Sequence, residues 1–230
     1  MAANRRFDLI LFDLDGTLFD TKQTILNAVC GYVKKAGLRP LTTEEVESFF
    51  GPPAIQSFKK YYPQMNDDEI SNTLAGYRKY YIENELLKAK MYDGTIDVLK
   101  KLKEEGYKIA LATYKLMTCV TPLLAHYDLA KYFDAIKGSV AEIGGTKTDI
   151  MREAIEACKV TDSDRICMIG DTDHDFGGAV NLNVSFIAVN YSHTFDNLSI
   201  DHRNYKKFIG ICDKAREILD VIEQGVENEI

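Results

Sequence analysis

Two carboxylates follow directly after an apolar run near the start of the chain. The run Ile10–Phe12 ends in Asp13-Leu-Asp15, and Gly16 follows at once. Such a run is typical of a strand that is buried on both faces, as in a parallel sheet. Side chains two apart on a strand point to the same side, so Asp13 and Asp15 are expected to share one face, and Gly16 lets the chain turn away. Because ligands of open α/β sheets bind at the carboxyl ends of strands, this end is a candidate site.

The chemistry of this pair favours a metal ion. Two neighbouring carboxylates repel each other, and a cation between them relieves that repulsion. Mg2+ is a hard ion that prefers oxygen ligands, which makes it the predicted cofactor. Taken alone, the pair is equally compatible with a polar turn after a strand. Polar residues elsewhere in the sequence distinguish the metal site from the polar turn.

Composition and charge exclude several classes of protein. With 230 residues, 46% of them hydrophobic, the chain can form one sizeable core and an accessory domain. No apolar run approaches the ~18 residues of a membrane span, and the first residues lack the apolar segment of a signal peptide. A cytoplasmic protein without a membrane partner is therefore expected. The net charge of −7 has the wrong sign for a nucleic-acid surface. Five widely spaced cysteines without a C-x-x-C pair suggest neither a disulfide framework nor a zinc site.

Residues 21–91 form a helical segment inserted after the first strand. Their periodicity is helical throughout, no convincing strand interrupts it, and capping boxes at Thr42–Glu45 and Asn66–Glu69 open two of the helices. About seventy residues is far more than the usual 2–6 between a strand and a helix, so the segment is predicted to be a small helical-bundle domain. It is rooted beside Asp13 and Asp15, where it can cover the site as a cap. A purely structural appendage is the alternative.

From residue 92 onward, predicted helices and strands alternate. Strands are expected at 108–113, 133–137, 165–171 and 185–190, and helices at 96–102, 115–126, 147–159 and 213–223. This alternation predicts a parallel sheet with helices on both faces, a Rossmann-like three-layer α/β core. The expected domains are a core of residues 1–20 and 92–230 and a cap of residues 21–91.

Polar residues follow the ends of these strands. Thr113 ends one strand, and Asp171 ends another and is followed by Asp173 and Asp175. Thr113 is compatible with a helix N-cap and with a ligand for a phosphate oxygen. The acidic loop lacks the glycine and the glutamate that an EF-hand requires. Because parallel strands bring their carboxyl ends to one edge, the loop and the first acidic pair together predict an oxygen-rich Mg2+ site.

Lys147 lies at the start of a predicted helix, after Gly144-Gly-Thr. A cation there conflicts with the helix dipole unless an anion is near, which indicates a phosphate or a carboxylate. A solvated surface lysine is the alternative. The chain has neither a G-x-x-x-x-G-K-[ST] loop nor a G-x-G-x-x-G turn after a strand, so nucleotide-binding interpretations lack their signals.

Four features in sequence order resemble the motifs of the haloacid dehalogenase superfamily of phosphohydrolases, from Phe7 to about Asn190. They are Asp13-Leu-Asp-Gly-Thr17, Thr113, Lys147 and Gly170-Asp-Thr-Asp-His-Asp175. The insertion between the first motif and Thr113 resembles the first type of cap in that family. The turn Gly51-Pro-Pro53 and the segment Tyr92-Asp-Gly-Thr95 are most similar to the phosphoglycolate phosphatase and β-phosphoglucomutase branch.

The resemblance implies a role for each matching residue. Asp13 would be the nucleophile that forms an aspartyl-phosphate, and Asp15 the general acid that then becomes the base. Thr113 and Lys147 would bind the transferring phosphoryl group.

The same resemblance implies a metal site. Mg2+ would be held by Asp13, the backbone carbonyl of Asp15 and Asp171. Asp175 would bond through water or to Lys147, and the division of labour among the three acids of the loop is left open. Tyr114 departs from the pattern, because relatives usually carry a small polar residue there. Its bulk is expected to narrow the site or to contact the leaving group.

The implied function is a Mg2+-dependent phosphatase acting on a small phosphorylated metabolite: a phosphoglycolate-like ester, a nucleoside monophosphate or a sugar phosphate. A phosphomutase would use the same residues. A non-catalytic regulator would be expected to have lost Asp13 or Asp15, and a true dehalogenase would leave Asp15 and the metal-binding acids without a role. Monomer and homodimer both remain open. Candidates for substrate specificity are Gly51, Lys59, Lys60, Arg78 and Tyr114.

Overall fold

The computed structural model describes residues 5–50, 52–140, 145–192 and 200–227. Its centre is a six-stranded sheet in the order β5-β4-β1-β6-β7-β8, in which every neighbouring pair is parallel. The strands are β1 (Leu9–Phe12), β4 (Lys108–Leu116), β5 (Ala135–Ser139), β6 (Ile166–Gly170), β7 (Ser185–Val189) and β8 (Phe208–Cys212). The predicted parallel α/β core is confirmed.

Strand β1 lies at the centre of the sheet and is buried on both faces. Ile10 and Phe12 pack into one hydrophobic cluster, and Leu9 and Leu11 pack into a second cluster on the other face. All four side chains have no exposed surface. The continuous apolar run therefore alternates between two cores, as a central parallel strand requires.

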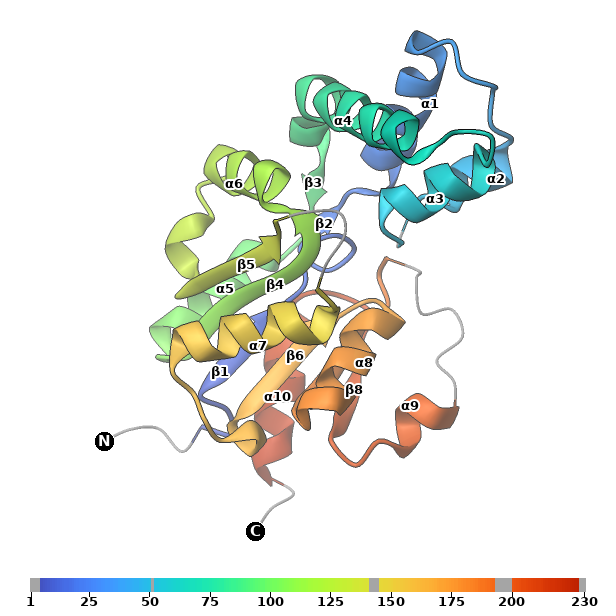
Figure 1. Ribbon diagram of the computed structural model, residues 1–230. Helices are drawn as coiled ribbons and strands as arrows, with labels where there is room; N and C mark the ends of the chain where they lie inside the picture. Colours follow the sequence, from blue (N-terminus) through green and yellow to red (C-terminus); the bar gives the residue numbers. More distant parts are fainter. Residues whose placement is uncertain (1–4, 51, 141–144, 193–199, 228–230) are drawn as a thin grey trace.

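Helices cover both faces of the sheet (Figure 1). Helices α7 (Lys147–Cys158) and α8 (Asp173–Leu182) pack on the face of Leu9 and Leu11. Helices α5 (Thr95–Glu104), α6 (Met117–His126) and α10 (Glu217–Glu227) lie on the other face. The short helix α9 (Ile200–Asn204) precedes β8, and single 3₁₀ turns occur at Ala130–Tyr132 (η2) and Ser163–Arg165 (η3).

A helical insertion follows β1 and stands over the carboxyl ends of the strands (Figure 1). It contains four helices, which we call the cap helices: α1 (Lys22–Lys35), α2 (Thr43–Glu47), α3 (Ala54–Tyr61) and α4 (Asp67–Asn84). A 3₁₀ turn, η1 (Leu86–Lys88), follows α4. The insertion has its own aromatic core, in which Phe58 is fully buried and contacts the rings of Tyr32, Phe49, Tyr62 and Tyr77. The exact division into residues 21–91 and the remainder stays a prediction.

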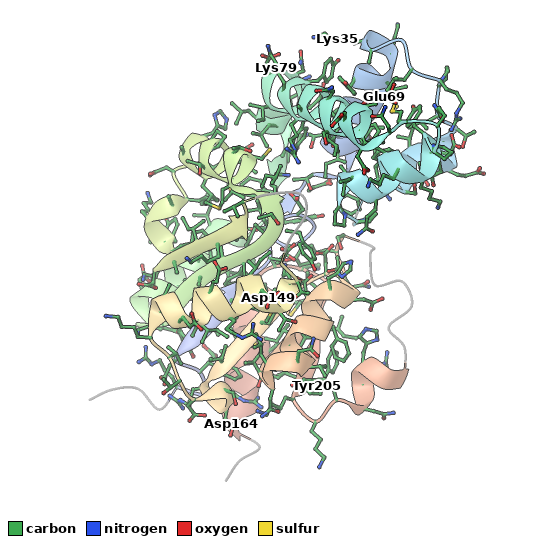
Figure 2. All side chains as sticks on the ribbon, in the orientation of Figure 1. Lys35, Glu69, Lys79, Asp149, Asp164 and Tyr205 are labelled. Atoms are coloured by element: carbon green, nitrogen blue, oxygen red, sulfur yellow. The ribbon has the colours of Figure 1, made fainter. Side chains whose placement is uncertain are left out.

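Both predicted capping boxes of the insertion are confirmed. The Asn66 side chain accepts a hydrogen bond from the Glu69 backbone N–H (3.0 Å), and the Glu69 carboxylate accepts one from the Asn66 N–H (2.8 Å). Thr42 and Glu45 make the same reciprocal pair at the start of α2. Glu69 is labelled in Figure 2 and lies in the first turn of α4.

Three strands were not predicted, and the start of the last helix was predicted wrongly. Phe19–Asp20 (β2) and Lys90–Met91 (β3) form an antiparallel pair at the base of the insertion, where no strand was expected. Two residues are too few to show an alternating pattern. Strand β8 was also missed, because it is a half-buried edge strand interrupted by Gly210. The last helix consequently begins at Glu217 and not at residue 213.

The capping box at the start of α4 leads to a stability prediction. Asn66→Ala removes the side-chain acceptor from the helix start and should lower the free energy of unfolding by about 1 kcal/mol, whereas Asn66→Gly should cost only a few tenths. Urea unfolding of both variants and the wild type measures the difference. An unchanged stability for Asn66→Ala would show that the capping box does not stabilise α4.

Candidate active site

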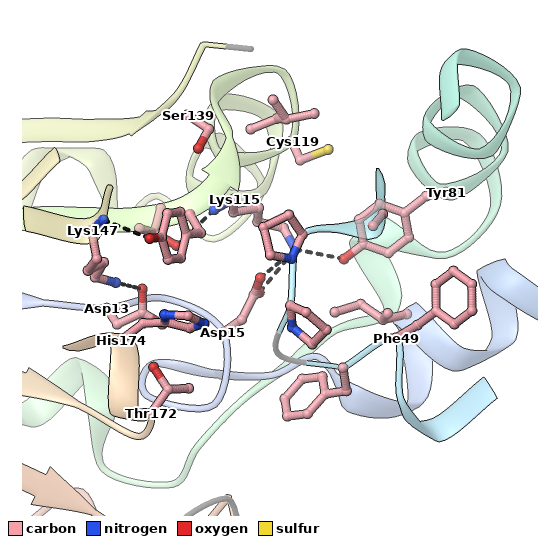
Figure 3. A pocket seen from close by; sticks show the side chains of 18 of the residues that line it. Asp13, Asp15, Phe49, Tyr81, Lys115, Cys119, Ser139, Lys147, Thr172 and His174 are labelled. Atoms are coloured by element: carbon pink, nitrogen blue, oxygen red, sulfur yellow. Dashed lines mark hydrogen bonds and ion pairs between the residues drawn. The ribbon is translucent and has the colours of Figure 1, made fainter. Parts of the chain in front are cut away.

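Asp13 and Asp15 follow β1 and line the same pocket, as predicted from their spacing. They nevertheless engage different partners. The Asp13 carboxylate lies against Lys147, whereas Asp15 is paired with Lys115 on the side of the cap helices (Figure 3). Leu14, between them, is fully buried in the core. The strand end therefore directs two acids into one pocket but to two lysines.

Gly16 makes the turn that brings the acidic loop close to β1. Its φ is +80°, and a Cβ at this position would lie 1.9 Å from Oδ2 of Asp171. Only glycine fits both the backbone conformation and this close approach. The next residue, Thr17, is fully buried and its hydroxyl donates a hydrogen bond to Oδ1 of Asp171 (3.3 Å). The turn thus fixes the position of the Asp171 carboxylate.

Lys147 is buried at the first position of α7 and joins two carboxylates. Its Nζ lies 2.5 Å from Oδ1 of Asp13 and 2.6 Å from Oδ1 of Asp175. Burial lowers the pKa of Lys147, but the two carboxylates outweigh burial and raise that pKa above its ordinary value. The side chain is 4% exposed, so the interpretation as a surface lysine is excluded. The neighbouring Gly144 lies outside the described residues.

Three buried carboxylates gather beside this lysine. Oxygen atoms of Asp13, Asp171 and Asp175 lie within 4.8 Å of one another. Burial, helped by the Asp175 carboxylate, raises the pKa of Asp13 against the opposing effect of the Lys147 ammonium. Three carboxylates facing one ammonium leave two uncompensated negative charges. The donor set and the charge both fit a hard divalent cation.

The acidic loop divides its carboxylates between two environments. Asp175 is fully buried, and its Oδ2 accepts hydrogen bonds from the Thr172 N–H (3.1 Å) and hydroxyl (2.6 Å). The Asp173 side chain is 82% exposed and pairs with His202 (2.7 Å). Asp175 therefore belongs with the buried cluster and contacts Lys147 directly, while Asp173 points away from it. His174 lies in α8 and lines the pocket.

Thr113 and Tyr114 form the wall of the pocket beside Lys147. Thr113 is buried within β4 and its hydroxyl accepts the Lys115 N–H (3.2 Å). The N-cap position of α6 is Leu116, so the alternative that Thr113 caps this helix was wrong. The Tyr114 hydroxyl accepts the backbone N–H of Lys147 (2.7 Å). Tyr114 thus contacts the start of α7 and lines the pocket, and its expected effect on the width of the site stays a prediction.

Lys115 was missed by the sequence analysis. The predicted helix 115–126 placed it in a first helical turn, but β4 extends to Leu116 and α6 begins at Met117. Its side chain is 6% exposed and contacts Asp15. A lysine two residues after Thr113, near a strand end, was the available signal.

The pocket lies between the core and the cap helices and has a volume of about 200 Å³ (Figure 3). Its floor is polar, and apolar side chains of the insertion form much of the opposite wall. That wall includes Phe49, Pro52, Pro53, Tyr77 and Tyr81, and Arg78 of the same insertion also lines the pocket.

Two of the five specificity candidates, Arg78 and Tyr114, line the pocket. Among the described residues, the lining does not include Lys59 or Lys60, and Lys59 forms an exposed ion pair with Asp67. Gly51 lies outside the described residues.

Two relatives with similar sequences carry the names of enzymes that hydrolyse phosphate compounds. A 5'-nucleotidase of Pseudomonas aeruginosa is 30% identical over 189 residues, covering 81% of this chain and 84% of that protein. A pyrophosphatase of Halalkalibacterium halodurans is 27% identical over 185 residues, covering 80% and 83% of the two chains.

Solved structures extend the similarity to the whole fold. A crystal structure of a predicted phosphatase from Clostridium acetobutylicum has a TM-score of 0.78 and 30% identity, and the match covers 96% of this chain and 99% of that one. Neighbours that carry the name phosphoglycolate phosphatase are 17–23% identical, and their likeness shows the fold alone. The model of the haloacid dehalogenase-like hydrolase family matches residues 10–189. The chain belongs to the haloacid dehalogenase-like hydrolases.

Proposed function

We propose that this protein is a Mg2+-dependent phosphatase that hydrolyses a small phosphomonoester through an aspartyl-phosphate on Asp13. One observation carries the proposal: the Lys147 ammonium lies between Asp13 and Asp175, beside Asp171, at the floor of a pocket. Phosphoryl transfer needs positioning and compensation of charge more than covalent help from the protein. This arrangement of residues is suited to both.

The residues around the cluster have complementary tasks in this proposal. Asp13 supplies the oxygen that attacks phosphorus, while Lys147 and Thr113 hold the phosphoryl oxygens. Asp15 gives a proton to the departing oxygen and then takes one from the water that attacks the phosphoryl-enzyme, which releases phosphate and restores Asp13. Bound by Asp13, the Asp15 carbonyl and Asp171, Mg2+ would neutralise charge on the phosphoryl group.

The buried charges argue against a non-catalytic role. A buried ionic cluster seldom stabilises a fold better than apolar residues of similar volume would. Three acids and a lysine in a pocket are therefore best explained by the chemistry that they perform. A phosphomutase would use the same floor and return the phosphoryl group to a sugar, so analysis of the products separates it from a phosphatase.

The pocket supports the proposed substrate class, and a screen of phosphate esters tests it. A volume of about 200 Å³ with a partly apolar wall suits a small organic phosphate. Phosphoglycolate, nucleoside monophosphates and sugar phosphates are the proposed substrates, and pyrophosphate belongs in the panel because one relative bears that name.

The first expected outcome concerns the metal. Phosphate release should require Mg2+ and stop after EDTA, and Mg2+ should raise the melting temperature of the wild type. Asp171→Asn should abolish that increase because it removes a proposed ligand. Asp173→Asn is the matched control, since this acid in the same loop is exposed and points toward His202. Full turnover after exhaustive chelation would contradict the metal dependence.

The second expected outcome separates Asp13 from Asp15. Asp13→Asn should remove turnover of every ester, because no phosphoryl-enzyme can form. Asp15→Asn should retain more single-turnover activity on p-nitrophenyl phosphate than on an alkyl phosphate, since the aryl leaving group needs little protonation. Release of both leaving groups is measured at one metal concentration.

Equal relative losses of Asp15→Asn on the two esters would reject Asp15 as the general acid. Substantial turnover by Asp13→Asn would reject the covalent route.

A further inference from the structure

Lys115 is a buried cation that lines the pocket. The chemistry proposed above assigns it no role. It reaches the pocket because β4 is irregular there. Thr113 pairs with Gly138 and Leu116 pairs with the next residue, Ser139, so Tyr114 and Lys115 have no partner in the ladder and form a bulge. Bulges commonly redirect side chains beside active sites. This one directs two adjacent side chains toward the site.

Gly138 on the neighbouring strand makes room for this bulge. A Cβ at position 138 would lie 2.6 Å from the backbone oxygen of Lys115. A larger residue would therefore displace Lys115. The pairing of β4 with β5, rather than a surface loop, therefore determines the position of this lysine.

The ammonium of Lys115 joins the catalytic loop to the cap helices. Its Nζ lies 3.0 Å from both carboxylate oxygens of Asp15 and 3.0 Å from the hydroxyl of Tyr81 (Figure 3). Burial lowers the pKa of Lys115, but Asp15, the Tyr81 hydroxyl and the Cys119 thiol together outweigh burial and raise that pKa above its ordinary value, so the side chain is an ammonium. The two contacts from one ammonium restrain the position of the Asp15 carboxylate.

Tyr81 is itself fixed within the insertion. It lies on α4, is 4% exposed, and its ring stacks on Tyr77 with centroids 6.3 Å apart and an interplanar angle of 12°. Tyr81, Lys115 and Asp15 therefore form a continuous chain of contacts from a cap helix to the proposed acid. Lys147 pairs with Asp13 and Asp175, whereas Lys115 pairs with Asp15, so the two lysines serve different acids.

We propose that Lys115 is a positioning residue that aligns Asp15 for proton transfer to the leaving group, and that Tyr81 of the cap aligns Lys115. The inference rests on the proposed function and deepens it. A protonated carboxyl group has one O–H donor and keeps acceptor sites, so Asp15 can give its proton to the departing oxygen while it still accepts from the Lys115 ammonium. Lys147 would then bind the phosphoryl group, and Lys115 would position the carboxyl group that donates the proton.

The leaving group distinguishes this role from a merely structural one. Lys115→Met keeps the apolar stem and removes the charge. It should lower kcat/KM for the best alkyl ester by roughly 10- to 100-fold and that for p-nitrophenyl phosphate by less than about threefold. Lys115→Arg retains a cation and should recover part of the loss. Lys137→Met, on the neighbouring strand β5 and half-exposed, is the control.

A second variant tests the contribution of the cap and covers the case in which Lys115→Met does not fold. Tyr81→Phe removes only the hydroxyl and keeps the stacked ring. It should reduce turnover of the alkyl ester about fivefold, the scale of one hydrogen bond, with little effect on the aryl ester. Tyr80→Phe is the matched control, because Tyr80 is adjacent on α4 and is not among the described residues that line the pocket.

Three results decide the outcome. A selective loss on the alkyl ester in Lys115→Met and Tyr81→Phe supports the assignment. Equal losses on both esters, or no loss, in a folded variant would overturn it while leaving the proposed phosphatase intact. A wild type that hydrolyses neither ester would instead reject the proposed function.

Discussion

The site depends on one buried ammonium held between carboxylates that are distant in the sequence. Lys147 begins α7, Asp13 comes directly after β1, and Asp175 lies in the first turn of α8. Removing one partner of such a buried pair typically costs about 3–5 kcal/mol, because the other charge is left uncompensated. Lys147 therefore links α7 to the end of β1 and to the start of α8, at the point where the proposed chemistry occurs.

The sheet order explains how these elements meet. Strand β1 pairs with β4 on one side and with β6 on the other. All three strands run parallel, so Thr113, Asp13 and Asp171 emerge at one edge, under the helices inserted after β1. Gly16 completes this arrangement, because a Cβ there would occupy the space of the Asp171 carboxylate. A central strand with no exposed surface supplies the rigid base that a charged pocket requires.

The parts of the molecule that could be predicted from the sequence are those with a local physical signal. The apolar run of β1, the capping boxes of the insertion and the acids at strand ends each have a pattern that the structure confirms. Lys115 has only a weak local signal, its place near a strand end, because its position results from a bulge in β4 where that strand pairs with β5. The half-buried edge strand β8 was missed for a similar reason, since it is defined by its pairing with β7 and its own residues show no alternation in burial.

The central claim, that Asp13 carries the phosphoryl group, is open to direct observation. The wild type is mixed with substrate and Mg2+, quenched with acid within the first turnover, digested and examined by mass spectrometry. The account predicts a peptide containing Asp13 that has gained one phosphoryl group, is labile to hydroxylamine, and is absent from Asp13→Asn. Rapid release of phosphate by the wild type with no phosphorylated peptide at any quench time, or with the phosphoryl group on another residue, would contradict the account.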